Sequence, residues 1–466
     1  MRSGDVPSDP DTTGTVAAAY DRLDPASRNA TGIVHDPDTY VTGVPFAELA
    51  SLQQEHGVVP VAEPERPGWP AGSGYWLVLR HADVDRVVKD ASTFSSELGG
   101  TQIRDPGTEE DLAFVRRMML NMDPPEHSRL RKMLARSFTP RAVEKLEEQI
   151  LGHARGIVDR MLAAGPEGTC DFAKDVAADL PLLTLADVLG VPAEDRMLMF
   201  DWSNRVIGWQ DEDYATSRAF DTASGSAFAR EAALLRPEPG PDARMPDPRS
   251  RAGMLDLYTY AHLLGQEKRE RPGDDVMSTL MGQRDDAGGS VSVEEFENLF
   301  WLFAVAGNET LRNGIPGGMM ALLEHPEAQR QLRADPTLIP AAVEEMLRWW
   351  TPVMTFRRTA TRPVQLAEAQ IEAGDKVVVS FTAGNRDPAA FGRPDDFDLV
   401  RGGRGHLAFG AGPHFCLGAH LARTQMRALF TELLTRTSWI EAAGDPAWLR
   451  SNFQRGVKRL PITWRR

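Results

Sequence analysis

Helical periodicity runs through most of this chain and limits the folds open to it. Apolar side chains recur at three- and four-residue intervals in many segments, most clearly 142–163, 294–311, 341–350 and 419–434. Ser292 with Glu295 three residues later has the pattern of a capping box. β-Like runs are short and far apart, at 75–79 and 376–381. Helices and strands do not alternate as in a βαβ array, so we predict a mainly α fold with small β-sheets.

Composition excludes several functional classes. Apolar residues make up 42% of the 466 and charged residues 26%, as in globular proteins. The net charge of −15 argues against a nucleic-acid binder, because affinity for phosphate requires an excess of Lys and Arg. The chain has no apolar run of about 18 residues to span a membrane, and its N-terminus lacks the apolar core of a signal peptide. We therefore expect a soluble, cytoplasmic protein.

Two stretches bear on domain organisation. Residues 1–20 are polar and rich in Pro, Asp and Thr, so we expect them to be disordered and 21–466 to form a single domain. The segment RPEPGPDARMPDPRSR, 236–251, carries five prolines between helical stretches. Proline removes N–H donors and fixes φ, which predicts a loop or mobile flap. A domain linker is the alternative, but the sequence continues helical beyond it, which favours an insertion in one domain.

Cys416 is one of only two cysteines, the other being Cys170. A disulfide between them is not expected in a reducing compartment. A zinc site requires clustered ligands, and no second cysteine lies near. A nucleophile requires an activating base, and His414 lies two residues before Cys416. The remaining alternatives are a plain core cysteine and an axial thiolate ligand to haem iron.

The surrounding sequence, FGAGPHFCLGAHLAR, favours the iron ligand. Three glycines allow a tight backbone that turns its amide hydrogens toward the sulfur: Gly410, Gly412 and Gly418. Amide donors stabilise a thiolate and tune the metal it binds. Phe409 is expected to shield the sulfur from water, and a helix beginning near Leu417 would bring the positive end of its dipole.

The same stretch resembles the haem-binding loop of the cytochrome P450 family, F-x-x-G-x-x-x-C-x-G. The match is complete at Phe409, Gly412, Cys416 and Gly418, and the resemblance extends from about residue 40 to the C-terminus. It implies a helical fold in which a b-type haem lies buried between two helices. Cys416 would be its axial ligand, and Gly410 would also contact it.

Two further motifs resemble the family's partners for the haem carboxylates. In MDPPEHSRLRKML, His127 and Arg131 lie four residues apart on one helical face. The resemblance implies that they bind the carboxylates as charge-assisted donors, whereas a solvated helix surface is the alternative. In FRRTATRPVQL, Arg358 matches a strand arginine that reaches a haem carboxylate. His414 is expected to be another such partner rather than a base for Cys416.

The stretch FAVAGNETLRN, 303–313, resembles the family's long central helix. Ala306 and Gly307 would lie against the haem. A glycine and a hydroxyl in mid-helix weaken its hydrogen bonding, which leaves room for dioxygen and a water. The resemblance implies that Thr310 holds the bound oxygen species and its water, and that Glu309 helps to relay protons.

Two further features concern the scaffold. Glu345 and Arg348 match the family's E-x-x-R, and Arg401 lies where its third member is expected. The resemblance implies that these three residues support the haem loop. Pro316 has no N–H to donate to the carbonyl of Arg312, so we expect the central helix to kink or end early there.

The resemblance implies a haem-thiolate monooxygenase that uses O2 to hydroxylate a C–H bond. A thiolate ligand favours O–O cleavage, and the cofactor carries the difficult chemistry. The sequence shows no flavin, nucleotide or iron–sulfur motif, so the electrons are expected from a separate ferredoxin with its reductase. A basic patch is the candidate docking site for the ferredoxin, and the alternative is that its residues are scattered over the surface without forming a site. The patch comprises Arg129, Lys132, Arg136, Arg423 and Arg427.

The substrate is expected to be a mainly apolar small molecule, because the motifs are most similar to bacterial branches that oxidise steroids, branched lipids and terpenoids. The pocket candidates are apolar: Ile103, Phe303, Ala304, Val353, Met354 and Phe453. The proline-rich segment lies where the family has a lid over its channel. The alternatives are a tailoring oxidase of a secondary-metabolite or amino-acid pathway, a peroxide-using or non-oxygenating haem-thiolate enzyme, and a non-catalytic haem sensor.

Overall fold

The structure is a computed structural model that describes residues 14–466 except 67–68, 208–210, 212–223 and 242–244. The α-helices are α1 Gly14–Tyr20, α2 Pro25–His35, α3 Phe46–Glu55, α4 His81–Lys89, α5 Glu109–Val115, α6 Glu126–Ser137, α7 Pro140–Leu162, α8 Asp179–Leu189, α9 Leu198–Ile207, α11 Ala227–Ala233, α12 Leu255–Glu270, α13 Val276–Gly282, α14 Val293–Glu324, α15 Pro326–Ala334, α16 Ile339–Trp350, α17 Phe381–Gly384 and α18 Ala419–Arg436. The strands are β1 Val58–Val61, β2 Tyr75–Val78, β3 Phe94–Ser95, β4 Glu167–Asp171, β5 Thr355–Ala360, β6 Val364–Leu366, β7 Ala369–Ile371, β8 Lys376–Ser380, β9 Trp439–Ala442, β10 Ala447–Trp448, β11 Val457–Arg459 and β12 Pro461–Arg465. Among the described helices, none combines the length and apolar character needed to cross a bilayer.

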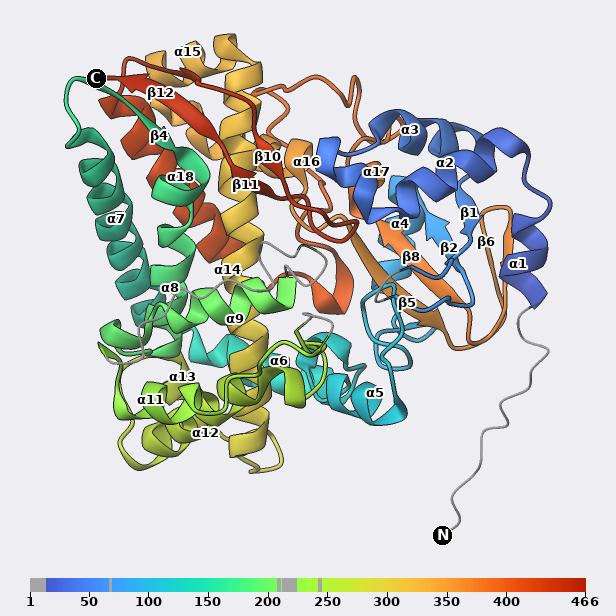
Figure 1. The fold of residues 1–466 in the computed structure, drawn as a ribbon, viewed down its shortest axis with the longest axis horizontal. Helices are drawn as coiled ribbons and strands as arrows, with labels where there is room; N and C mark the ends of the chain where they lie inside the picture. The colour runs from blue at the N-terminus through green and yellow to red at the C-terminus, as the bar shows by residue number, and fades with distance from the viewer. Residues whose placement is uncertain (1–13, 67–68, 208–210, 212–223, 242–244) are drawn as a thin grey trace.

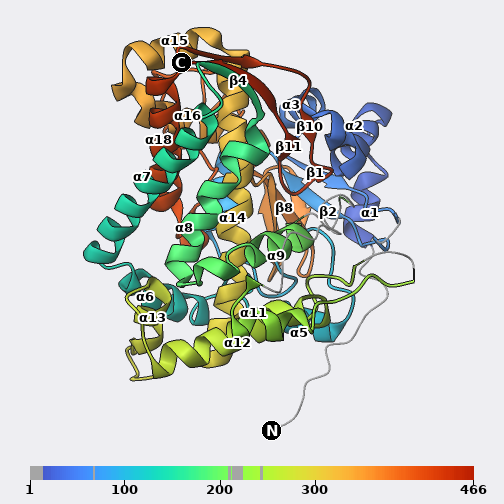
Figure 2. The same cartoon turned by 60° about the vertical axis from the view of Figure 1, so that its left-hand side comes forward.

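A sheet-containing part and a larger helical part lie side by side (Figure 1). The first holds a five-stranded sheet in the order β1–β2–β8–β5–β3, with α1 to α4 around it. Strands β2 and β8 pair in parallel although they come from opposite ends of the chain. In the second part, α14 passes through the middle, with α7, α8 and α18 beside it (Figure 2). The largest apolar core lies where α7, α14, α16 and α18 meet.

The central helix α14 continues through Pro316 to Glu324, so the expectation that it ends early is wrong. Close packing supports the turn after the proline. A Cβ at Gly317 would lie 2.1 Å from the Trp350 ring on α16, and Gly318 packs similarly closely on α18. These contacts hold the backbone in place where Pro316 has no N–H to donate.

The predicted elements agree with the structure to within a few residues, except at the N-terminus and for the helix predicted over 294–311, which continues to Glu324. The four predicted helices overlap α7, α14, α16 and α18, and the two predicted strands overlap β2 and β8. The capping box is confirmed, since Ser292 and Glu295 each accept the other's backbone N–H. Residues 14–20 form α1, and Val16 is buried in a core, so the expected disorder is wrong for these residues. Residues 1–13 lie outside the described part.

The described part of the proline-rich segment is a loop, as predicted, and both of its ends are anchored. Near its start, Arg236 forms an ion pair with the buried Asp201 at 2.8 Å. Near its end, Arg249 pairs with Asp247 at 2.9 Å and donates to the Arg104 carbonyl at 2.9 Å. The loop therefore packs against the segment around residue 104.

Candidate active site: a cysteine loop beside a buried cavity

The residues before α18 form a tight loop that presents Cys416. Gly410 and Gly412 have φ angles of +66° and +68°, the left-handed region that favours glycine. A Cβ at Gly412 would also lie 2.6 Å from the Val88 carbonyl oxygen, so α4 packs directly on the loop. The Cys416 N–H donates to the Phe409 carbonyl at 2.9 Å and closes the loop. The thiol therefore lies at the positive end of the α18 dipole.

Opposing effects act on the Cys416 thiol. Burial raises its pKa, because desolvation disfavours the thiolate. The Gly418 N–H, which donates to the sulfur, and the charges of Arg131 and Arg423 lower it. At Cys170, burial and neighbouring aspartates both raise the pKa, to about 12. Burial has the larger effect, so the pKa of Cys416 is raised overall. Of the two free thiols, only Cys416 has an amide donor and cationic neighbours that favour an anionic sulfur.

A cavity of about 270 Å³ opens beside Cys416. Its wall is mostly apolar and comes from α6, α8, α14, β5, the cysteine loop and the start of α18. Most of the predicted catalytic and haem-binding residues line it: His127, Arg131, Ala306, Gly307, Thr310, Arg358, Phe409, Gly410, His414, Cys416 and Gly418. Glu309 is the exception among these described residues.

Four basic side chains converge on this cavity, and the described residues that line it include no carboxylate, although the charge of Asp123 acts on His127 and Arg358 from outside the lining. The His127 and His414 rings lie 4.1 Å apart, and Arg131 and Arg358 line the same wall. Burial, and then neighbouring cations, lower the pKa of His127 to about 4 and that of His414 to about 2. Burial also lowers the pKa of Arg358 to about 10. Within the described part of the chain, neither ring nitrogen of His127 has a hydrogen-bond partner, although the residue is 1% exposed.

These residues fit a haem. No Asp or Glu is present among the described residues that line the cavity, so its four basic side chains have no carboxylate on the wall itself to neutralise them. Two carboxylates at the edge of a haem would supply those anions. On the same wall, Cys416 offers a sulfur ligand for the iron. The Gly418 N–H donates to this sulfur, and such a hydrogen bond orients a metal ligand and tunes the metal.

Helix α14 places Thr310 and Glu309 on different faces. Thr310 lines the cavity, and its hydroxyl donates to the Ala306 carbonyl at 2.9 Å. Glu309 is 1% exposed, and its Oε1 lies 2.6 Å from the Arg312 guanidinium. The alcohol therefore faces the cavity, while the acid lies behind it in an ion pair.

The predicted E-x-x-R residues form a buried cluster. Glu345 and Arg348 have fully buried side chains, with 2.7 Å between carboxylate and guanidinium. Arg401 approaches the same Glu345 oxygen at 3.4 Å. Arg348 also donates to the Asn385 carbonyl at 2.8 Å, which ties α16 to the segment after α17.

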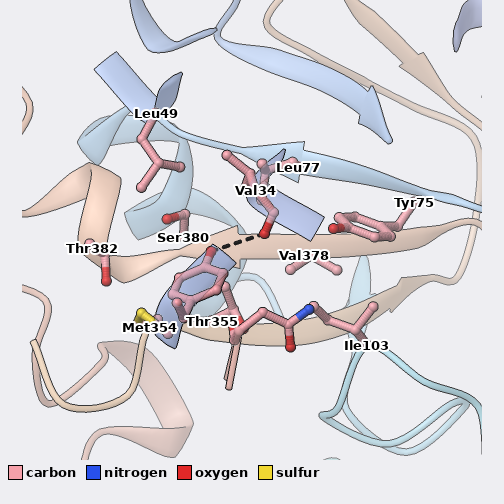
Figure 3. A pocket seen from close by; sticks show the side chains of 12 residues that line it. Val34, Leu49, Tyr75, Leu77, Ile103, Met354, Thr355, Val378, Ser380 and Thr382 are labelled. Atoms are coloured by element: carbon pink, nitrogen blue, oxygen red, sulfur yellow. Dashed lines mark hydrogen bonds between the residues drawn. The ribbon is translucent and has the colours of Figure 1, made fainter. Parts of the chain in front are cut away.

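The predicted substrate-pocket residues lie in different places. Phe303 and Val353 line the cavity beside Cys416. Ile103 and Met354 instead line a separate cavity of about 10 Å³ between the sheet and the N-terminal helices (Figure 3). Two further candidates lie in packed surroundings: Ala304, which is fully buried in α14, and Phe453, which packs on Phe356.

The five residues predicted as a basic docking patch form ion pairs or hydrogen bonds with other side chains of the protein, mostly carboxylates. Arg129 pairs with Glu295 and with Asp285 at 3.3 Å, while Lys132 and Arg136 share Asp286 at 2.6 and 3.1 Å. The other two residues are Arg423, which pairs with Glu344, and Arg427, which donates to Thr424 at 3.1 Å. Acidic side chains therefore offset much of the charge of this surface.

Many residues at the site were not predicted from the sequence, among them Arg312, Gln425 and Ser96. Arg312 follows Glu309 by three residues, a spacing that the sequence does show. Gln425 lines the cavity from α18, and helical spacing from the cysteine loop could have indicated it. Ser96, whose hydroxyl lies 3.2 Å from Nε2 of His414, is 318 residues away and has no local sequence signal.

Comparison with known sequences gives consistent results. Residues 259–461 match the model of the family described as cytochrome P450. A steroid C26-monooxygenase of Rhodococcus jostii is 34% identical over 433 residues, which cover 92% of this chain and 84% of that protein. A methyl-branched lipid omega-hydroxylase of Mycobacterium tuberculosis is 36% identical over 418 residues, which cover 89% of this chain and 90% of that protein.

Solved structures show the same similarity. A Mycobacterium marinum cytochrome P450 in complex with pseudoionone has a TM-score of 0.76 and 35% identity, and the match covers 95% of this chain and 98% of that one. CYP108D1 of Novosphingobium aromaticivorans has a TM-score of 0.78 and 31% identity, covering 94% and 98% of the two chains.

Proposed function

This chain belongs to the cytochrome P450 family of monooxygenases, and we propose that it hydroxylates a C–H bond of a steroid, a terpenoid, or a branched or long-chain lipid with electrons from a ferredoxin. One observation carries the proposal. Cys416 and four basic side chains meet at one mostly apolar cavity whose described lining residues include no carboxylate. That arrangement suits a haem on one side and a greasy substrate on the other.

Each group on the cavity wall has a task in this chemistry. Haem, when bound, activates O2 for insertion of one oxygen atom into a C–H bond. Cys416 binds the iron as a thiolate, which the Gly418 N–H stabilises. The basic residues hold the two carboxylates and so fix the orientation of the ring. The hydroxyl of Thr310, which faces the cavity, orients a water and passes protons inward.

An apolar substrate is supported by the cavity lining and by the relatives. Leu302, Phe303 and Val353 line the wall, where they would exclude water and bind hydrocarbon. Steroid C26-monooxygenase and methyl-branched lipid omega-hydroxylase are the names of two similar proteins. The first name refers to oxygenation of a steroid and the second to hydroxylation of a methyl-branched lipid. Steroids and branched lipids are both mainly hydrocarbon.

A separate ferredoxin is the proposed source of electrons. The described surface near α6 carries Lys132 and Arg136 beside Asp286, so docking would exchange one acidic partner for another. The proposed compartment is the cytoplasm, where both free thiols stay reduced. Product formation with purified ferredoxin and reductase, compared with the same mixture lacking ferredoxin, tests the electron route.

The first test is the visible spectrum of the reduced protein under carbon monoxide. We expect the strongly red-shifted Soret band of a thiolate-bound carbonyl. Cys416→Ser should lose this band, whereas Cys170→Ser, the matched control, should keep it. Steroids, terpenoids and fatty acids added to the oxidised protein should shift its spin state if they enter the cavity. Folded protein that takes up no haem, or a band that survives in Cys416→Ser, would overturn the proposal.

A further inference from the structure

A buried polar layer separates α9 from α14 behind the cavity. Asn204 on α9 is 7% exposed, and Asn308 and Glu309 on α14 are 0% and 1% exposed. In Figure 2, α9 crosses beside the middle of α14. Polar side chains this deep are normally hydrogen-bonded, so each of them requires a partner.

Arg312 lies at the centre of this layer. Its guanidinium is 2.6 Å from the Glu309 carboxylate, donates to the Asn204 side chain, and stacks over the Phe200 ring at 5.3 Å. Two of these three partners belong to α9, so the position of the arginine depends on how α9 packs on α14. The ion pair with Arg312 holds the Glu309 carboxylate on the face of α14 that packs against α9.

The acid and the cavity are therefore separated by the helix itself. Successive residues of an α-helix point about 100° apart, and only Thr310 of the Glu309–Thr310 pair lines the cavity. A carboxyl group can deliver a proton only when it comes within hydrogen-bond reach of the acceptor or of one bridging water. Glu309 must leave Arg312 to do so.

Asn308 points to a route for the return of the proton. Its side-chain Oδ1 and Nδ2 are both buried, and neither has a hydrogen-bond partner among the described residues. On a helix, residues four apart lie on one face, so Asn308 shares a face of α14 with Arg312. Buried polar groups without protein partners commonly bind ordered water, and one water typically makes about three hydrogen bonds.

We propose that Arg312 is a positioning residue that controls proton delivery by Glu309, and that the Asn308 amide holds a water that reprotonates this acid. In each cycle, a proton from solvent passes through that water to the Glu309 carboxylate, and the water remains neutral because it gains one proton as it gives one up. The neutral acid turns away from Arg312, gives its proton to a water beside Thr310 and returns to Arg312 as an anion. This inference rests on the proposed monooxygenase function.

The test compares holoenzyme variants under two oxidant supplies. Arg312→Gln removes the charge and Arg312→Lys keeps it, while Asn308→Leu removes the amide at similar volume. Arg330→Gln is the matched control, because it breaks a Glu–Arg pair of the same spacing on the exposed helix α15. Product per electron and the solvent deuterium isotope effect are measured with O2 and donor. The assay is repeated with hydrogen peroxide, which brings both electrons and both protons with the oxygen.

With O2, we expect product per electron to fall roughly 5-fold in Arg312→Gln and Asn308→Leu, and the solvent isotope effect to double. The fall is smaller than the one expected from removing a general acid, because Glu309 itself remains. Arg312→Lys should stay within about 2-fold of the wild type, because the charge remains. With peroxide, all variants should match the wild type. A crystal structure of the holoenzyme should show a water on the Asn308 amide that Asn308→Leu lacks.

Other outcomes separate a failure of the proton-delivery proposal from a failure of the proposed monooxygenase function. If Arg312→Gln and Asn308→Leu behave like Arg330→Gln with O2, the proton route is wrong. If they lose as much with peroxide as with O2, their role is structural and the proposal fails. A holoenzyme crystal structure without a water on the Asn308 amide removes the reprotonation step. A wild-type enzyme that yields no product from either oxidant would instead contradict the monooxygenase function.

Discussion

The E-x-x-R cluster and the basic wall of the cavity are both buried and charged, yet among the described residues only the first contains a carboxylate of its own. The Glu345 carboxylate faces Arg348 at 2.7 Å and Arg401 at 3.4 Å. At the cavity, Arg358 is 3% exposed and donates to the carbonyl of its neighbour Arg357 at 2.8 Å, and no carboxylate is found among the described residues that line the wall with it. We therefore expect the E-x-x-R cluster to stabilise the fold and the basic wall to bind a ligand.

Charges paired within the fold stabilise it before any ligand binds, because removal of one partner leaves the other buried alone. Charges left without a partner lower the stability of the apoprotein and favour binding of a ligand that neutralises them. This comparison predicts opposite responses to mutation in the two clusters.

The largest effect is expected at Glu345. Glu345→Gln leaves the Arg348 guanidinium buried without its counter-charge, so we expect the free energy of unfolding to fall by about 3–5 kcal/mol. Urea unfolding of the apoprotein measures it. Glu327→Gln, which breaks an exposed pair of the same spacing with Arg330, is the control and should leave the midpoint unchanged. A Glu345→Gln protein as stable as the control would remove the structural role assigned to the cluster.

The next effect is a pH dependence caused by His127. Burial first and the Arg131 charge second hold its pKa at about 4 in the folded apoprotein, against about 6.5 when unfolded. The unfolded state therefore binds the proton at higher pH, and stability falls as pH drops from 7 to about 4. Between pH 7 and pH 5, protonation of His127 should lower the free energy of unfolding of the apoprotein by about 2 kcal/mol.

His127→Gln isolates this contribution, because glutamine does not titrate while the neighbouring His414, Arg131 and Arg358 remain. The difference in unfolding free energy between wild type and variant should change with pH over that window. In the haem-loaded protein the difference should shrink or change sign, because a carboxylate then faces the ring. A difference that is flat with pH in the apoprotein would show that the ring is not desolvated.

A smaller and opposite effect is expected at Arg358. Replacement by leucine removes a buried cation that has no facing carboxylate on the cavity wall, so we expect the apoprotein to gain about 1 kcal/mol. Haem affinity should fall roughly 10-fold or more, since a charge-assisted hydrogen bond to a carboxylate is lost. Apoprotein unfolding and haem titration measure the two halves. A loss of stability as large as that of Glu345→Gln would place Arg358 with the structural cluster instead.

The sequence predicted best those parts of the site that are local along the chain. The cysteine loop depends on glycines within ten residues, and the Glu345–Arg348 pair depends on one helical turn. The dominance of helix and the capping box of α14 follow from periodicity and from one turn of sequence. The passage of α14 through Pro316 was not predictable, because it depends on tertiary packing of Gly317 against Trp350.

Residues that meet through the tertiary fold were missed or misplaced. The Ser96 hydroxyl reaches His414 across 318 residues, and the Asp286 carboxylate meets Lys132 across 154. Ile103 was expected in the substrate pocket but lines the separate small cavity, together with Leu77 of β2 and Val378 of β8 (Figure 3). An apolar residue shows only that it will be buried, and its sequence neighbours do not show which cavity it will face.

The smallest effect is expected at Arg401, the outer member of the neutralised cluster. Its guanidinium approaches Glu345 at 3.4 Å and also donates to the carbonyls of Gly392 and Arg393 at 2.8 and 2.9 Å. Arg401→Gln should therefore lower the free energy of unfolding by about 1 kcal/mol, the value of ordinary hydrogen bonds, because Arg348 continues to neutralise Glu345. A double-mutant cycle with Glu345→Gln should give a coupling of about 0.5 kcal/mol. A coupling of several kcal/mol would mean that the carboxylate needs both arginines and that the cluster acts as one unit.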